Sequence, residues 1–175
     1  VTSTHLEKYN ILEKDAYCIS GEDFIQVNKR SKVEQFDILI SMIGTVGNIS
    51  YIKQKEINFA IKNVGLFKTS EKKEFANYIL FYLKSPIFND YLTSSVLGST
   101  QSYITLTGLR SIPLLDINDE KLIKKFNEYI NPIVNYIYKN VSITNKLYDL
   151  KEILLSKMAT IEDEKWNSLL MLKIL

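Results

Sequence analysis

The sequence has very few of the residues that build disulfides and metal centres. Its 175 residues include one cysteine, Cys18, and one histidine, His5. A single cysteine cannot form an internal disulfide, and one cysteine with one histidine cannot complete a closed zinc site. We therefore predict a cytoplasmic chain, kept in a reducing setting, that carries no structural metal.

An excess of charge of one sign is also missing. Lysine and arginine total 22 and aspartate and glutamate total 20, which leaves a formal charge of +2. Such a small charge does not predict nucleic-acid binding from bulk electrostatics, so any such binding must depend on local groups. No run approaches the roughly 20 apolar residues of a membrane span, and no leader opens the chain, so we expect no membrane partner. Because the chain opens at Val1 rather than Met, we expect a fragment or a processed product.

Familiar catalytic motifs are absent as well. The stretch 44–47 has neither the length nor the lysine of a phosphate-binding loop, and it is interpreted as a hairpin turn. The sequence has no nucleophilic-serine motif with which His5 could form a catalytic pair. The stretch 131–134 begins like the Asn-Pro-Pro-aromatic motif of amino-methyltransferases but does not complete it. Three acid-then-lysine triplets lie in charge clusters without a companion carboxylate for a metal. We expect no catalytic residues, no metal site and no cofactor.

The first part of the chain, 1–118, is predicted to be a globular domain. Its expected strands are short apolar segments: 37–43, 49–53, 57–61, 64–68 and 103–106. The first two should form a hairpin. A helix is expected from Ser70 to the Ser85-Pro86 pair, and its aromatic face is interpreted as core rather than as a platform for stacking bases.

From Asp119 onward the pattern changes to a heptad repeat. Steps of four and three connect twelve positions, ten of them apolar or aromatic: Leu122, Phe126, Tyr129, Ile133, Tyr136, Asn140, Ile143, Leu147, Leu150, Leu154, Lys157 and Ile161. This seam predicts a long helix over 119–165, followed by a C-terminal tail, 166–175. Pro132 predicts either a kink or a new helix that Asn131 caps.

The length of this helix indicates its role. From Pro132 to Ile161 it would span roughly 45 Å at 1.5 Å per residue, whereas a compact body of this size has a radius of gyration of about 16 Å. A protruding apolar seam needs a partner helix, from a second copy or from a segment absent from this chain. Helix pairing is assigned to the middle of the seam: Tyr136, Asn140, Ile143, Leu147, Leu150 and Leu154. Asn140 either fixes register as a buried polar residue or faces solvent while its neighbours make the contact.

Several segments, in a fixed order, resemble the target-recognition domain of a type I restriction-modification specificity subunit. They are 37–41 with 44–47, then 58–61, 98–101 and 112–114. Asn140, Leu147 and 150–158 resemble the conserved helix of that family. Phe36 stands where the family commonly has glycine, Lys151 and Glu152 replace its arginine-aspartate pair, and Ser156 replaces a proline. Such subunits usually carry two recognition domains and two helical segments, so this chain resembles a half-subunit.

The resemblance implies a non-catalytic role in DNA recognition. In the family, a pair of antiparallel helices holds two recognition domains apart, and each domain reads one half of a split sequence. The resemblance implies an α+β fold, with a mixed-sheet recognition domain followed by a coiled-coil-forming helix. It also implies double-stranded DNA, methyltransferase subunits and, through them, restriction subunits as partners. Two paired copies, a dimer, could read half-sites about one DNA turn of 34–36 Å apart.

Candidate DNA contacts were chosen from polar and basic groups in loops or strands. Arg30 is the first choice for a guanine contact and Gln101 for an adenine contact. The alternatives are a solvated surface charge for Arg30 and a structural turn for Gln101. The full set of candidates is Lys29, Arg30, Lys32, Thr45, Asn48, Lys53, Lys62, Ser99, Thr100, Gln101 and Ser102. The lysines among them are expected to position DNA rather than to specify its sequence.

In a competing hypothesis, the chain does not bind DNA sequence-specifically. In this case it is a protein-interaction module whose seam binds methyltransferase or coiled-coil partners, as a decoy or a remnant half-subunit. The near-neutral charge favours this hypothesis slightly. The resemblance to the target-recognition domain, within a match that covers roughly 36–162, favours DNA recognition more strongly.

Overall fold

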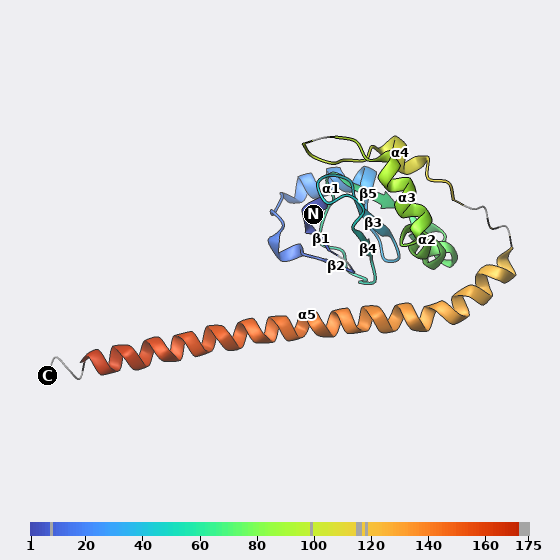
Figure 1. The fold of residues 1–175 in the computed structure, drawn as a ribbon. Helices are drawn as coiled ribbons and strands as arrows, with labels where there is room; N and C mark the ends of the chain where they lie inside the picture. The colour runs from blue at the N-terminus through green and yellow to red at the C-terminus, as the bar shows by residue number, and fades with distance from the viewer. Residues whose placement is uncertain (8, 99, 115–116, 118, 172–175) are drawn as a thin grey trace. The chain divides into compact units, whose positions relative to one another are not determined.

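The computed structural model describes residues 1–7, 9–98, 100–114, 117 and 119–171, with side chains as far as Ile161. The chain divides into two compact units, Val1–Asn135 and Tyr136–Leu175, here named the globular unit and the helical unit. Short strands, short helices and one long C-terminal helix alternate along the chain (Figure 1). The predicted α+β fold class is thereby confirmed.

A three-stranded antiparallel sheet forms the centre of the globular unit. Its middle strand, β3 (Ile38–Ser41), pairs with β4 (Ile49–Tyr51) on one side and with β5 (Val64–Phe67) on the other. All four residues of β3 are buried, which explains why this strand is a continuous apolar run rather than an alternating one. The predicted hairpin and the predicted strand 64–68 are confirmed.

A second, two-stranded sheet lies at the N-terminus. It consists of β1 (Leu6–Glu7) and β2 (Asn10–Ile11), which pair antiparallel and are flanked by the 3-10 turns η1 (Ser3–His5) and η2 (Glu13–Asp15). One core cluster joins the two sheets through buried side chains: Leu6, Val33, Leu39, Ile52, Phe59, Ile61 and Val64. The N-terminal segment therefore contributes to the core of the globular unit.

Two of the predicted strands are wrong. Segment 57–61 forms no strand, because its buried apolar side chains fill the core while its backbone meets the N-terminus, where the Val1 ammonium donates to Ala60 O at 2.7 Å. Segment 103–106 forms only single bridges, from Tyr103 to Ile43 and to Leu97. The chain then turns into α4 (Leu106–Arg110), because Thr105 Oγ1 accepts a hydrogen bond from Gly108 N as a helix cap.

The helix predicted from Ser70 begins later than expected. Two 3-10 turns, η3 (Thr69–Glu71) and η4 (Lys73–Phe75), precede α2 (Ala76–Leu83). The hydroxyl of Ser85 then accepts from Phe88 N at 3.2 Å and caps α3 (Pro86–Ser95), with a proline in its first turn. The predicted end of α2 is therefore also the beginning of α3.

The long helix, α5 (Glu120–Met171), has 52 residues, which corresponds to about 78 Å at 1.5 Å per residue. It continues through Pro132, so the predicted restart with Asn131 as a cap is wrong. Its first turns bend (Figure 1), as expected where a proline removes a backbone hydrogen bond. The backbone of 166–171, expected as a tail, continues the helix, and 172–175 lie outside the described residues. No helix in the described part of the chain has the length and hydropathy needed to cross a membrane.

The beginning of α5 is part of the globular unit. The side chains of Ile123 and Val134 are buried there, at 3% and 2% exposed. Phe126 meets Phe81 of α2 edge-on, with the ring centroids 6.2 Å apart. The division into compact units consequently falls inside the helix, after Asn135, later than the predicted boundary at 118.

Candidate nucleic-acid interface

The structure brings two of the predicted DNA-contacting loops side by side. The hairpin turn 44–48 joins β3 to β4, and the loop 98–102 follows α3. Gly44 N donates to Ser102 O at 2.9 Å, and Ile104 N donates to Met42 O at 2.9 Å. We name these two segments the polar edge. Thr45, Thr100, Gln101 and Ser102 are exposed there, whereas Ser99 lies outside the described residues.

Glycine allows the second loop to close tightly. Gly98 has a φ of +95°, and a Cβ at this position would lie 2.2 Å from Gln101 O. Leu97 and Tyr103 exchange two backbone hydrogen bonds across the loop, at 2.8 and 2.9 Å. The loop is therefore held at both ends, and only a residue without a side chain fits at Gly98. Gln101 and Ser102 are thereby presented next to a fixed bridge.

The first loop is held from inside the sheet. The hydroxyl of Ser41, which is fully buried, donates to Thr45 O and accepts from Asn48 N at 2.8 Å. The side-chain amide of Asn48 donates to Leu6 O at 2.8 Å. Asn48 was predicted to contact DNA, but its side-chain amide instead connects the turn to β1. Thr45 is the residue of this turn whose side chain remains exposed.

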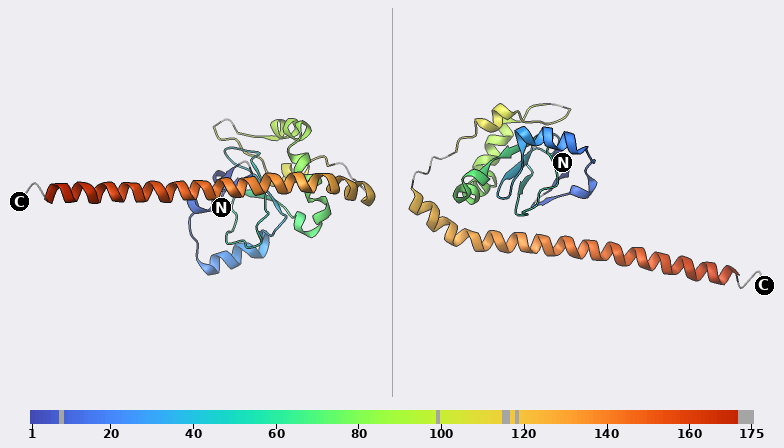
Figure 2. Two further views of the ribbon diagram at one scale, coloured as in Figure 1. Left: turned by 90° about the horizontal axis from the view of Figure 1, so that it is seen from below. Right: turned by 180° about the vertical axis from the view of Figure 1, so that it is seen from behind.

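The basic cluster around Arg30 lies elsewhere. Sequence reasoning treated it as a loop, but Lys29 and Arg30 end α1 (Gly21–Ser31), a helix that Ser20 caps by accepting from Asp23 N. Both side chains are exposed, and cations at a helix C-terminus interact favourably with the helix dipole. The left view of Figure 2 shows α1 at the opposite edge of the globular unit from the loop 98–102. Arg30 and Gln101 do not share one surface.

The remaining predicted lysines have different surroundings. Lys32 pairs with Glu34 at 3.0 Å. Lys53 Nζ donates to Asn135 Oδ1 at 2.9 Å and lies 5.4 Å from the centre of the Phe36 ring. Burial lowers the pKa of the Lys53 ammonium. Lys62 is exposed in the segment between β4 and β5. None of these lysines belongs to the polar edge.

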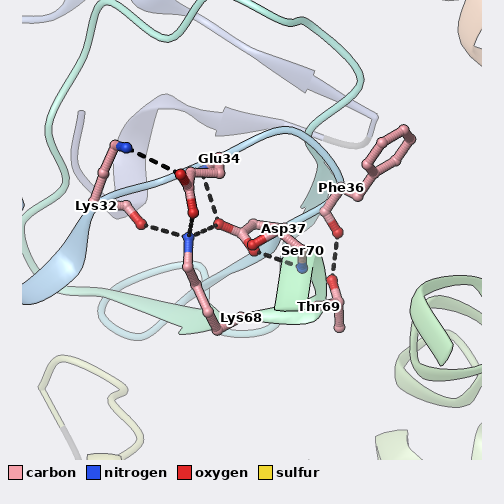
Figure 3. A network of polar contacts seen from close by, with 7 residues as sticks. All are labelled: Lys32, Glu34, Phe36, Asp37, Lys68, Thr69 and Ser70. Atoms are coloured by element: carbon pink, nitrogen blue, oxygen red, sulfur yellow. Dashed lines mark hydrogen bonds and ion pairs between the residues drawn. The ribbon is translucent and has the colours of Figure 1, made fainter. Parts of the chain in front are cut away.

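A charge network around one buried carboxylate holds the start of β3, at the other end of this strand from the hairpin turn (Figure 3). Asp37 is fully buried, and its carboxylate accepts from Lys68 Nζ at 2.8 Å, from Glu34 N at 2.7 Å and from Ser70 N at 3.0 Å. Lys68 Nζ also donates to Glu34 Oε2 at 2.7 Å and to Lys32 O at 3.0 Å. Burial would lower the pKa of Lys68, but its hydrogen bonds to the two carboxylates raise it. Asp37 therefore anchors the start of β3.

Phe36, the residue before this aspartate, has a left-handed backbone. Its φ is +78°, which is unfavourable for a residue with a side chain. Phe36 N donates to Ile52 O at 2.7 Å, and the Thr69 hydroxyl donates to Phe36 O (Figure 3). Glycine adopts a left-handed backbone without this cost. This explains why the specificity subunits that the sequence resembles commonly have glycine at this position.

Sequence reasoning missed one side chain at the polar edge. Tyr103, which bridges the two loops, is 41% exposed, and Leu97 beside it is 50% exposed. An aromatic residue directly after a polar glycine-centred stretch was the available signal. Tyr103 was passed over because 103–106 was interpreted as a strand.

Comparison with protein-family models matches residues 4–115 to the type I restriction modification DNA specificity domain. The chain belongs to this family. The specificity domain contains the polar edge, the Asp37 network and both sheets, and its end at 115 leaves α5 outside the matched region. No curated protein matches the chain.

Membership of the specificity-domain family gives the chain its broad role. It is a DNA-binding specificity subunit of a type I restriction-modification system. Domains of this family are in general non-catalytic. The predicted recognition of the family is therefore confirmed by a match that covers well over half of the chain.

Proposed function

We propose that the specificity domain reads one half of a bipartite DNA site through the polar edge. The observation that carries this proposal is the hydrogen bond from Gly44 N to Ser102 O, at 2.9 Å, which joins two loops that are far apart in the sequence. Their exposed side chains are an amide and hydroxyls, which can both donate and accept hydrogen bonds. The major groove presents such donors and acceptors in a pattern that differs between base pairs.

Gln101 is the residue proposed to specify a base. Its amide has one donor and one acceptor group in the arrangement that pairs with N7 and N6 of adenine. The loop around it is fixed by the Leu97–Tyr103 bridge, so the side chain starts from a defined position. Arg30 lies in the last turn of α1, a helix at the opposite edge of the globular unit from the loop 98–102, and it is proposed to contact phosphate rather than guanine.

The long helix is proposed to pair with a second copy or with the other half of a specificity subunit. In the described part of the helical unit α5 is the one element, so no other described residue of that unit covers its apolar side chains between Tyr136 and Ile161. The seam predicted from the sequence is exposed at Tyr136, Ile143, Leu147, Leu150 and Leu154, with 46% to 68% of each side chain accessible, and Asn140 is exposed with them. Methyltransferase subunits, and restriction subunits through them, are proposed to bind the paired assembly and to carry out the chemistry.

Three of the four seam positions that lie in the globular unit remain exposed, whereas the fourth, Phe126, packs against Phe81. Leu122, Tyr129 and Ile133 are 55%, 68% and 51% exposed, because the helix turns its other side, with Ile123 and Val134, toward the globular unit. One face of the first turns therefore packs on the recognition domain while a different face continues the seam. This arrangement supports a pairing surface that extends from the helical unit into the first turns of α5.

A binding experiment with randomised DNA tests the proposal. The full chain, with a methyltransferase partner, is titrated in gel-shift assays, and the bound sequences are compared for the parent, Gln101→Ala and the control Gln26→Ala, an exposed glutamine on α1. We expect Gln101→Ala to lose about 1–3 kcal/mol of discrimination at one base pair. The control should leave the selected sequence unchanged. Binding of the methyltransferase without any DNA preference would instead support the protein-interaction module.

A further inference from the structure

Three asparagines follow one another at intervals of four residues on α5, so their side chains lie on one face, one turn apart. All three amide oxygens accept hydrogen bonds from other elements of the globular unit. Asn77 Nδ2 donates to Asn127 Oδ1 at 2.9 Å and to Asn131 Oδ1 at 2.7 Å. Lys53 Nζ donates to Asn135 Oδ1 at 2.9 Å. We name Asn127, Asn131 and Asn135 the asparagine ladder.

The ladder is attached to two separate parts of the globular unit. Asn77 belongs to α2 and is only 5% exposed, whereas Lys53 follows β4. Asn127 also donates from its own amide nitrogen to Glu74 O, just before α2, at 2.7 Å. Because Asn77 is buried, the loss of a hydrogen-bond partner there would cost about 1–3 kcal/mol. The two contacts of Asn77 therefore constrain the helix more strongly than the exposed contacts of Lys53 and Glu74 do.

We propose that the asparagine ladder fixes the axial register of α5 on the recognition domain. The apolar contacts beside it contribute to this, because a slip of one turn would bring Asn127 or Asp119 to the buried position of Ile123. Phe126, Ile130 and Val134, in contrast, form a row with the same four-residue spacing, so a slip brings another apolar or aromatic side chain to each position of this row. The directional hydrogen bonds of the ladder distinguish registers where this row does not.

A slip in either direction is penalised. If the helix moved so that each position received the residue four places later, Lys139 would take the position of Asn135 and oppose the ammonium of Lys53. If it moved the other way, Ile123 would take the position of Asn127, and the buried Asn77 would lose one acceptor. The observed register is the one that satisfies all three asparagines.

The consequence for DNA rests on the proposed function. One helical turn is about 5.4 Å, and the rise of duplex DNA is about 3.4 Å per base pair. A one-turn slip would therefore move one recognition domain by about 1.6 base pairs, and slips in both copies of a pair by about 3 base pairs. The ladder residues are thus positioning residues for the length of the spacer between two half-sites.

Distance measurement between spin labels tests the register without DNA. The only cysteine, the exposed Cys18, is replaced by serine, and labels are placed at Ser94→Cys on α3 and Glu128→Cys on α5, both exposed. We expect one narrow distance distribution for this parent. A broad distribution in the parent would overturn the proposal.

The principal variant replaces the polar contact by an apolar one. It combines Asn77→Leu, Asn127→Leu and Asn131→Leu, which keeps side chains of similar size and leaves no buried amide unpaired. We expect an unchanged or raised melting temperature together with a second distance component. A purely structural role predicts a lower melting temperature and one unchanged distance, and this result would contradict the proposal.

A surface variant keeps the test decisive if the triple variant does not fold. Lys139→Glu would convert the repulsion of the slipped register into an ion pair with Lys53, so a second distance is expected again. The matched control, Lys146→Glu, changes an exposed lysine two turns further along α5 and should keep the single distance. A single distance in Lys139→Glu and in any folded ladder variant overturns the proposal.

Selection from split-site DNA libraries then separates the register from the proposed function. The parent is expected to accept one spacer length, and the ladder variants to accept additional lengths that differ by about 1–3 base pairs. A second spin-label distance without DNA selection by any variant would support the register and reject the proposed function. Broader spacer selection with a single spin-label distance would reject the register.

Discussion

The globular unit buries many of its apolar side chains, whereas the helical unit leaves its described apolar side chains exposed or half-exposed. In the globular unit, Ile38, Leu39 and Ile40 are completely buried in the middle of the sheet. In the helical unit, none of the described side chains from Tyr136 to Ile161 is buried, and Leu147 is 59% exposed. The first unit therefore contains its own hydrophobic core, whereas the second supplies half of a core that a partner helix would complete. Mutations in the two units should consequently change different equilibria.

The largest effect is expected from Asp37→Ala, which changes folding of the globular unit. The substitution removes a fully buried acceptor and leaves the Lys68 ammonium and the backbone donors Glu34 N and Ser70 N without it. We expect the free energy of unfolding to fall by about 3 kcal/mol. Urea denaturation, followed by near-ultraviolet circular dichroism, measures this change.

The matched control is Glu34→Gln, which removes the second acidic partner of Lys68. The side chain of Glu34 is 44% exposed, so its ion pair should contribute less than about 1 kcal/mol. An Asp37→Ala variant as stable as this control would show that the buried network does not anchor β3.

Leu147→Ala should change association instead of folding. The leucine is more than half exposed in the single chain, but in a helix pair it would be buried in the seam. We expect little change in unfolding of the globular unit and a loss of about 2 kcal/mol in pairing, which corresponds to a roughly 30-fold higher dissociation constant. Sedimentation velocity over a range of concentrations gives this constant.

The control for pairing is Lys146→Ala, one residue before the leucine and outside the seam. It should leave the dissociation constant within about twofold, because a solvated side chain contributes little to pairing. A parent chain that stays monomeric at every concentration would remove the case for a second copy and favour a different half-subunit as the partner. An equal weakening of pairing in Leu147→Ala and Lys146→Ala would show that the seam is not the pairing surface.

The two units also differ in how far their sequences predict them. The hairpin of β3 and β4 and the long helix were found because their signals are local: a β-branched run next to glycines, and a repeat of four and three. Helix α1 was missed because it is short and none of its residues is fully buried, so its few apolar residues, Phe24, Ile25 and Val27, give only a weak periodic signal. Its cap, Ser20 followed by Glu22 and Asp23, was the signal available.

Long-range contacts explain the remaining errors at the site. Segment 57–61 has strand-like apolar residues, but its backbone meets Val1, which no local pattern indicates. The sequence groups Arg30 with Gln101 as DNA contacts, although α1, which carries Arg30, and the loop 98–102 lie at opposite edges of the globular unit, and it gives no sign that Tyr103 bridges the two loops. Similarly, the asparagines of α5 repeat visibly in the sequence, but their meaning depends on Asn77, 50 and 54 positions away from the two that it contacts.

A smaller effect is expected at Phe36, where the globular unit contains a strained residue. The variants Phe36→Gly and Phe36→Ala both remove the ring that lies near Lys53 and Lys73. Only the alanine keeps a Cβ at a φ of +78°. We therefore expect the glycine variant to be more stable than the alanine variant by about 1 kcal/mol. Thermal unfolding compares them, and an alanine variant that melts at the same temperature or higher would contradict the strain.

The smallest effect is the pH dependence that Glu34 gives to the globular unit. Hydrogen bonds from Lys68 and then Lys32 lower the pKa of this carboxyl from 4.5 to about 2. Because the pKa is lower in the folded state than in the unfolded state, the ion pairs stabilise the fold above pH 4.5 and lose this effect as the pH falls toward 2. Solvent screens the pairs, so the contribution should stay below about 1 kcal/mol.

The Glu34→Gln variant isolates this contribution from that of the other carboxyl groups. We expect the difference in unfolding free energy between parent and variant to be constant near neutral pH and to shrink between pH 4.5 and about 2. The corresponding change in the helical unit, Glu152→Gln, affects an exposed pair with Lys151 at 3.6 Å and should leave unfolding of the globular unit unchanged. A parent-to-variant difference that does not vary over this range would mean that Glu34 is not paired in solution, and that the globular unit depends on Asp37 alone for its hold on Lys68.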